Sequence, residues 1–215
     1  MAQRTIHYLF GERLCEKGFV KDRGRFLLGS ILPDAYTRRE ERLIAHFQND
    51  SLKDRRYFDF DRFYEEYEKE IREDDLYFGY YMHLVEDDFY REFFHTKEKI
   101  PRMRNEEDEN RLHDDYHLLN AHIVEKYGIS FDLCVPEGFE EEKICRIVSF
   151  DIEGFLKEME GDFHETVKGK TVFIHEEMAD RFIEDYLPLT VREAEAVYRG
   201  KRLCKASDYA WSTLK

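Results

Sequence analysis

Apolar residues recur at spacings of three and four along most of the chain, a period typical of amphipathic helices. The broadest apolar stripe runs from Asp74 to about Thr96 and predicts a central helix. Narrower stripes predict further helices over residues 5–18, 60–72, 106–127, 139–158, 174–186 and 190–211. The pattern therefore predicts an all-α protein.

Three segments interrupt this pattern. Residues 26–34 read as an apolar turn or short helix that Pro33 breaks, which places Asp34 just beyond the break. Residues 130–138 are expected to form a loop or short extended piece, and 161–173 is the one place where a short hairpin is expected. Without a linker or repeat, residues 1–215 are predicted to form a single helical domain, in which 139–215 is a C-terminal helical extension.

The composition indicates a folded core. Of the 215 residues 42% are hydrophobic, and 18 Phe and 14 Tyr offer ample apolar surface, which argues against disorder. No stretch approaches the roughly 20 apolar residues that a membrane-spanning helix needs. The N-terminus carries no signal-peptide pattern and the four cysteines form no C-x-x-C pair, so we expect a cytoplasmic protein with reduced thiols.

The net charge limits the kinds of molecule that the protein is expected to bind. With 34 basic and 48 acidic residues the formal net charge is −14. Such a field repels polyphosphate at long range, so stable binding of nucleic acid or of an anionic membrane is not expected. Divalent cations are attracted instead.

A set of polar side chains lies inside apolar runs of the first 90 residues. His83 and Asp87 are four residues apart in the predicted central helix, so they project from one face and are able to bind a single divalent ion. His7, Asp34 and His46 also have apolar neighbours. Taken singly, each reads more simply as a core histidine bonded to a backbone carbonyl or as a helix-capping aspartate. Five such groups in one helical chain favour a shared site, because a buried polar group without a partner costs about 2–7 kcal/mol.

The order of these residues along the chain also resembles that of a known family. His7, then Gly29-Ser30-Ile31-Leu32-Pro33-Asp34, then Ala45-His46-Phe47, then Gly79-Tyr80-Tyr81-Met82-His83-Leu84-Val85-Glu86-Asp87 resembles the zinc-dependent phospholipase C family. The resemblance covers roughly residues 5–127. It implies a multi-helix bundle of the phospholipase C / P1 nuclease type, to which the C-terminal helices are an addition.

The resemblance also implies a site and a reaction. His7 is expected to bind one Zn²⁺, and Asp34, His46 and His83 its neighbour, with Asp87 as the bridge. A hydroxide held between two such ions attacks a phosphodiester, and Asp34 is the expected catalytic carboxylate that orients it or accepts its proton. The implied substrate is a small phosphate-ester or phospholipid-like molecule.

Departures from the family leave alternatives open. Its secreted members use an N-terminal tryptophan as a ligand, where this chain has Met1-Ala2 before His7. A third zinc would need His95 and residues of the segment 113–117. The possible ligands or supporting residues in that segment are His113, Asp115 and His117. Their spacing departs from the family pattern, and on a helix residue 115 points away from residues 113 and 117. The adjacent His113-Asp114 suggests an HD-type phosphohydrolase as one alternative, and a helical scaffold without turnover is another.

Overall fold

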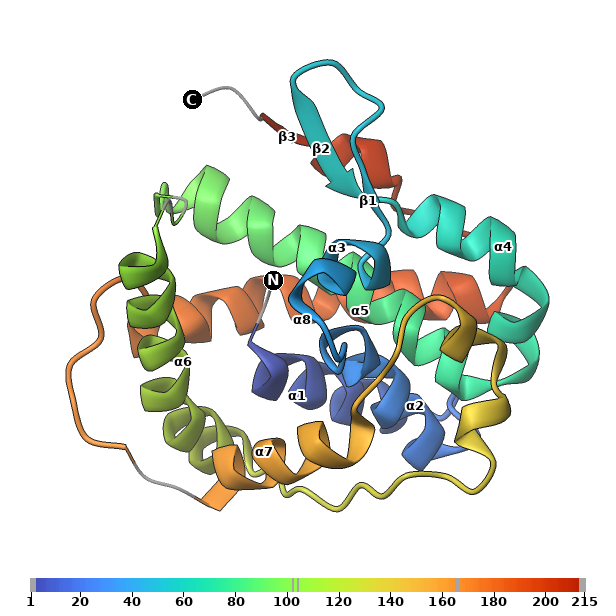
Figure 1. The fold of residues 1–215 in the computed structure, drawn as a ribbon, viewed down its shortest axis with the longest axis horizontal. Helices are drawn as coiled ribbons and strands as arrows, with labels where there is room; N and C mark the ends of the chain where they lie inside the picture. The colour runs from blue at the N-terminus through green and yellow to red at the C-terminus, as the bar shows by residue number, and fades with distance from the viewer. Residues whose placement is uncertain (1–2, 102, 104, 165–166, 213–215) are drawn as a thin grey trace.

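The computed structural model describes residues 3–101, 103, 105–164 and 167–212. These residues form a predominantly helical bundle with a small antiparallel sheet at one end (Figure 1). The α-helices are α1 (Arg4–Cys15), α2 (Arg23–Ile31), α3 (Arg42–Ala45), α4 (Phe60–Glu73), α5 (Asp75–Arg91), α6 (Glu106–Tyr127), α7 (Ile152–His164) and α8 (Glu176–Tyr198). The strands are β1 (Gln48–Asn49), β2 (Arg55–Phe58) and β3 (Trp211–Ser212). The predicted all-α class is confirmed.

Helix α5 is the central element, as its broad apolar stripe predicts. Every residue from Leu76 to Tyr90 is buried, because α1, α2, α4 and α8 pack around it (Figure 1). Asp74 begins the helix by accepting a hydrogen bond from the backbone N–H of Leu76 at 2.9 Å. Beyond Arg91 the chain continues as a π-helical turn, Glu92–Lys97.

Two glycines let α2 and α5 approach at backbone distance. A Cβ atom on Gly29 would lie 2.0 Å from the carbonyl oxygen of Leu76, and one on Gly79 would lie 2.1 Å from that of Phe26. Any side chain at either position would therefore push the helices apart. This close crossing carries the second half of α2 against the middle of α5, where the polar residues of the central helix begin.

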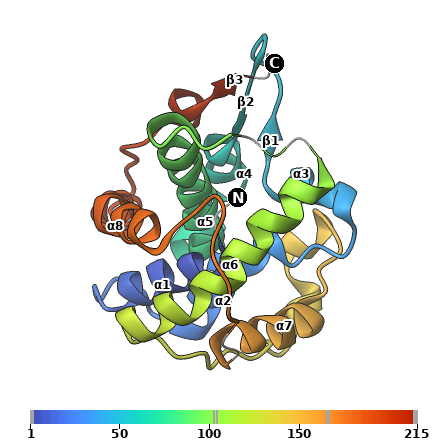
Figure 2. The same cartoon turned by 90° about the vertical axis from the view of Figure 1, so that its left-hand side faces the viewer.

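The second half of the chain surrounds this core. Asn105 caps the start of α6, and Gly128 ends the helix in the left-handed conformation with φ of 64°. Helix α6 packs on α1 and α7, and α8 lies across the other side of α1 and α5 (Figure 2). No described helix is long and apolar enough to cross a membrane.

Three predicted helices at the C-terminal end are wrong in their boundaries. Residues 139–151 form only short 3-10 turns, and α7 starts at Ile152 because Asp151 caps it through the N–H of Gly154 at 3.0 Å. The predicted break near residue 188 is absent: α8 continues through Pro188, since its apolar face is buried on both sides of the proline. Helix α8 then ends at Tyr198, well before 211.

The small sheet and the segment 161–173 also differ from expectation. Strand β2 pairs antiparallel with β1 and with β3, which ties the C-terminal segment to residues 48–58. The pattern gives no signal for it, because two of the strands are only two residues long. In the described part of 161–173 helix α7 extends to His164 and no strand follows. All four cysteines are free.

Candidate metal centre

Five polar side chains from separate elements meet beside the α2–α5 crossing. His7 lies on α1, Asp34 ends a 3-10 turn (Leu32–Asp34) after α2, His46 follows α3, and His83 and Asp87 lie on α5. Four of the side chains are completely buried, and Asp34 alone retains 11% exposure. The cluster is therefore enclosed, and among its five members the edge nearest solvent is Asp34.

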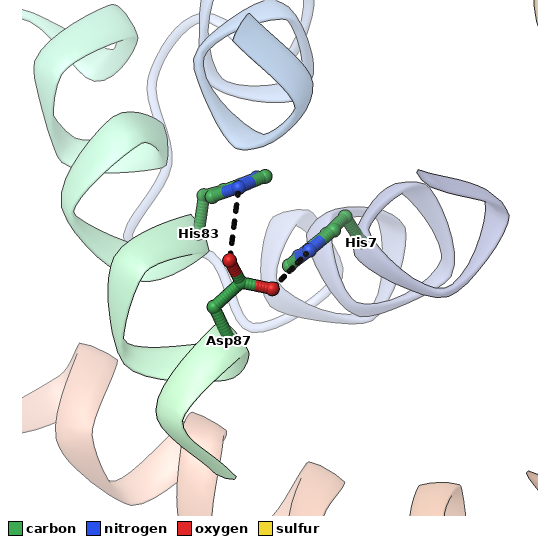
Figure 3. Close-up of side chains that lie close together, drawn as sticks. All are labelled: His7, His83 and Asp87. Carbon is green, nitrogen blue, oxygen red and sulfur yellow. Dashed lines mark ion pairs between the residues drawn. The ribbon is translucent and has the colours of Figure 1, made fainter. Parts of the chain in front are cut away.

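The carboxylate of Asp87 lies between the rings of His7 and His83 (Figure 3). Its Oδ1 lies 3.4 Å from Nε2 of His7, and its Oδ2 lies 3.5 Å from Nε2 of His46 and 3.9 Å from Nε2 of His83. Nε2 of His46 is also 3.3 Å from Oδ1 of Asp34. The two oxygens of Asp87 thus face two different sets of partners, as a bridging carboxylate does.

Each histidine has its outer nitrogen bonded to an acceptor. Nδ1–H of His83 donates to the carbonyl oxygen of Ser30 at 2.8 Å, and Nδ1–H of His46 donates to that of Arg42 at 2.8 Å. Nδ1 of His7 lies 2.7 Å from Oε2 of Glu86. Oxygen acceptors at all three Nδ1 atoms leave all three Nε2 atoms pointing inward, which is how metal-binding histidines are commonly supported.

The inward atoms do not satisfy one another. Nε2 of His83 lies 3.2 Å from Nε2 of His46, and two neutral rings that both carry Nδ1–H present only lone pairs there. Nε2 of His7 and Oδ1 of Asp34 are buried without a hydrogen bond to any described residue. Lone pairs that converge in a buried space need a proton or a cation between them.

The protonation states of the histidines depend on the carboxylates near them. Burial disfavours a charged ring, but Asp87 and Glu86 outweigh it and raise the pKa of His7 to about 10. Burial and the neighbouring His7 lower the pKa of His83 to about 3, so this ring stays neutral. Although Asp34 is desolvated, its contact with His46 lowers its pKa to about 2. At neutral pH the cluster thus holds an ionised Asp34 and a neutral ligand-ready His83.

The donor chemistry fits a divalent transition metal. Among the described residues two groups have ligand atoms within 4.8 Å of one another: His7, His83 and Asp87, and Asp34, His46 and His83. Imidazole nitrogen and carboxylate oxygen are the ligands that Zn²⁺ accepts. The five residues that the sequence singles out are thus brought together, and they are the ones that would hold the ion or ions.

The four residues considered for a third metal lie outside both groups. Nδ1–H of His95 donates to the carbonyl oxygen of Ile100 at 3.0 Å. Nδ1 of His117 lies 3.3 Å from Asp162, and the ring of His113 stacks on Tyr116. These contacts describe local roles on the surface of α6 and at the end of α5, and they give a third site no support.

Asp115 has a structural role instead. Its carboxylate accepts hydrogen bonds from three consecutive backbone N–H groups, at 2.7, 2.6 and 2.9 Å, and so anchors the segment before α8 to α6. The three donors are Val172, Phe173 and Ile174. Both oxygens are thus engaged by backbone donors, and Asp115 belongs to neither donor group of the described residues.

Sequence reasoning missed Glu86. Its side chain is 1% exposed and contacts His7, which is 79 positions earlier in the sequence. No spacing rule connects these two residues. The available signal is a glutamate that follows Val85 in an apolar run, since glutamate is rarely buried without a partner.

Cavities elsewhere do not compete with this cluster. A surface cavity of about 600 Å³ lies between α6 and the segment 167–177, and its lining includes none of the five donors. Comparisons with family models, curated proteins and solved structures find no match for this chain. The interpretation of the cluster therefore depends on its own geometry.

Proposed function

We propose that the protein is a divalent-metal-dependent hydrolase of phosphate esters, with Zn²⁺ as the preferred ion. The observation that carries the proposal is the convergence of three Nε2 atoms and two carboxylates, each histidine being supported at its outer nitrogen. Such an arrangement is costly without a cation and matches the ligand preference of zinc.

The residues divide into two positions around Asp87. Asp34, His46 and His83, with Oδ2 of Asp87, would hold one ion; His7 and Oδ1 of Asp87 face the other. When bound, such ions supply positive charge to phosphoryl oxygens and lower the pKa of water. Because Asp34 is ionised and lies at the exposed edge, its carboxylate is the group that orients a water molecule and accepts its proton.

A phosphate ester suits the charge of this chain. The formal charge of −14 repels anions at long range, so a phosphate group needs local positive charge, which bound ions provide. Two neighbouring residues of α3, Leu43 and Ile44, are 46% and 53% exposed and precede His46. They offer apolar contact to a phospholipid-like substrate, which favours such a substrate over a nucleic acid.

The first test is metal content together with hydrolysis. Protein that is stripped with a chelator and dialysed against Zn²⁺ is expected to retain one or two equivalents by elemental analysis and to hydrolyse a chromogenic phosphodiester. His83→Ala should lose the metal and the hydrolysis, whereas His122→Ala, which removes a histidine paired with Asp180 on the surface, should keep both. Wild-type protein without metal and without hydrolysis would refute the proposal.

Two alternatives remain distinguishable. An HD-type phosphohydrolase needs His113 in the metal shell, but the ring lies outside both donor groups of the described residues. His113→Ala should accordingly leave the metal content unchanged. A scaffold without turnover would bind metal and hydrolyse neither the chromogenic diester nor phospholipid vesicles, and that pair of substrates also separates a soluble from a lipid substrate.

A further inference from the structure

A second buried carboxylate contacts the cluster without belonging to either donor group. Oε2 of Glu86 lies 2.7 Å from Nδ1 of His7, and the two side chains are 1% and 0% exposed. The next residue, Asp87, faces the other nitrogen of the same ring at 3.4 Å. The imidazole of His7 is thus held between consecutive carboxylates of helix α5.

Glu86 and Asp87 contact different nitrogens of the His7 ring and have different effects on it. A histidine binds a metal through one nitrogen, and a hydrogen bond at the other nitrogen selects which one it is. Oε2 of Glu86 is within hydrogen-bond distance of Nδ1 and is placed to accept its hydrogen, so Glu86 keeps a proton on Nδ1. Nε2 is the nitrogen that can exchange its proton for a cation. Stacking against His83, with ring centroids 3.8 Å apart, holds the ring in this orientation.

We propose that Glu86 is a positioning residue: it fixes His7 with Nδ1 protonated and so commits Nε2 to the metal ion. This inference rests on the proposed metal-dependent function. Its effect is concentrated at one position, because Glu86 contacts His7, whereas His46 and His83 donate their outer N–H groups to backbone carbonyls.

The ligand-poor side depends most on Glu86. Besides the shared His83, the donor group on this side contains only His7 and Asp87, whereas the other group has Asp34, His46 and His83 with Oδ2 of Asp87 close by. Weakening His7 therefore removes a larger share of the ligands there. We expect loss of Glu86 to affect one metal equivalent and to spare the other.

The test uses two substitutions at residue 86 and one matched control. Glu86→Leu removes the acceptor, Glu86→Gln keeps one oxygen but cannot ionise, and Asp88→Asn makes the same acid-to-amide change at a neighbouring, fully buried side chain that faces the backbone N–H of Phe58. Zn²⁺ affinity is measured by competition with a chromogenic chelator, and Co²⁺-loaded protein is examined by visible absorption, which reports the ligand set directly.

The expected order is specific to the His7 position. Glu86→Leu lowers the affinity of one equivalent by about 100-fold and Glu86→Gln by about 10-fold, the range known for supporting partners of metal-binding histidines. Both change the Co²⁺ spectrum, and Asp88→Asn changes neither the affinity nor the spectrum.

The outcomes separate this inference from the proposed function. If the wild-type protein binds no metal, the proposed function fails. If the wild-type protein binds metal and Glu86→Leu binds it with the same affinity and spectrum, only the role of Glu86 is overturned. Should Glu86→Leu not fold, the comparison of Glu86→Gln with Asp88→Asn decides, since equal behaviour of these two variants also overturns the role.

Discussion

Two regions of the molecule bury carboxylates in opposite ways. Glu193 on α8 is completely buried, and all its contacts are donors: the hydroxyl of Tyr81 at 2.8 Å and the backbone N–H groups of Leu203 and Cys204, both at 2.9 Å. Asp87 is equally buried, but its oxygens face the Nε2 atoms of three histidines at 3.4–3.9 Å.

The difference separates a structural carboxylate from a proposed ligand. The donors around Glu193 compensate its desolvation and fasten the segment after α8 to the core, so nothing further is needed there. Towards the three rings the distances from Asp87 are 3.4–3.9 Å, longer than ordinary hydrogen bonds, and an Nε2 atom of a neutral ring presents a lone pair there. Burial alone is therefore a poor indicator of function; the chemical type of the facing atoms is the informative quantity.

The largest expected effect is the loss of metal affinity when the charge of Asp87 is removed. Asp87→Asn keeps the shape but removes the carboxylate that both donor positions share, so metal affinity should fall by more than about 100-fold, beyond the loss caused by supporting partners. Elemental analysis after dialysis measures this. Retention of the full wild-type metal content would show that Asp87 is, like Glu193, a structural group.

Separating α2 from α5 should be the next largest effect. Gly79→Ala places a Cβ about 2.1 Å from the carbonyl oxygen of Phe26, so the helices must move apart at a cost of about 3 kcal/mol or more. The same movement shifts Ser30 away from His83 and weakens metal binding. Urea denaturation measures the stability. Gly128→Ala, at a position with nothing within 4 Å but with φ of 64°, is the control and should cost about 1 kcal/mol.

Glu193→Gln should lower stability and leave metal binding unchanged, in contrast to Asp87→Asn, which should lower metal affinity. A glutamine has one acceptor oxygen instead of two, so either Tyr81 or the N–H groups of residues 203 and 204 lose their partner, at a cost of about 1–3 kcal/mol. Thermal unfolding should therefore occur at a lower temperature while the metal content stays unchanged. A loss of metal in this variant would mean that the two regions are coupled.

The metal-free protein should show a pH dependence of its stability that comes from the same cluster. Because Asp87 and Glu86 raise the pKa of His7 to about 10, the folded state holds a proton that the unfolded state releases above about pH 6.5. This contribution to stability is complete below pH 6.5 and declines by at most about 1.4 kcal/mol per pH unit as pH rises towards 10.

Thermal unfolding at several pH values, with chelator and with Zn²⁺, tests this dependence. A cation at Nε2 takes the place of the proton, so the decline should be present with chelator and reduced with Zn²⁺. In the His7→Asn variant the decline should be reduced even with chelator. Equal slopes under all three conditions would contradict the assignment.

Much of the fold was predictable because helical periodicity is a local property. The helix at 106–127 matches its prediction, since acidic residues begin it and Gly128 ends it. The continuous helix across Pro188 was not predictable, because burial of the apolar face on both sides outweighs a local break. The three-stranded sheet likewise depends on pairing between residues 55–56 and 211–212, which no local pattern encodes.

The candidate site was predictable in its members but not in its arrangement. Polar residues in apolar runs identify His7, Asp34, His46, His83 and Asp87, because burial requires partners. The sequence does not show that Ser30, Arg42 and Glu86 support the three rings, since two of these are backbone carbonyls and one is far away in the chain.

The glycine-lined contact between α2 and α5 has a consequence for folding. The donors are up to 80 positions apart in sequence, from 7 to 87, and only this contact and its neighbours gather them, so an unfolded chain has no comparable affinity for an ion. Under the proposed function, ion binding would shift the equilibrium towards the folded state, by about 2.7 kcal/mol when free metal is 100 times the dissociation constant. The availability of metal would then determine how long the native protein survives.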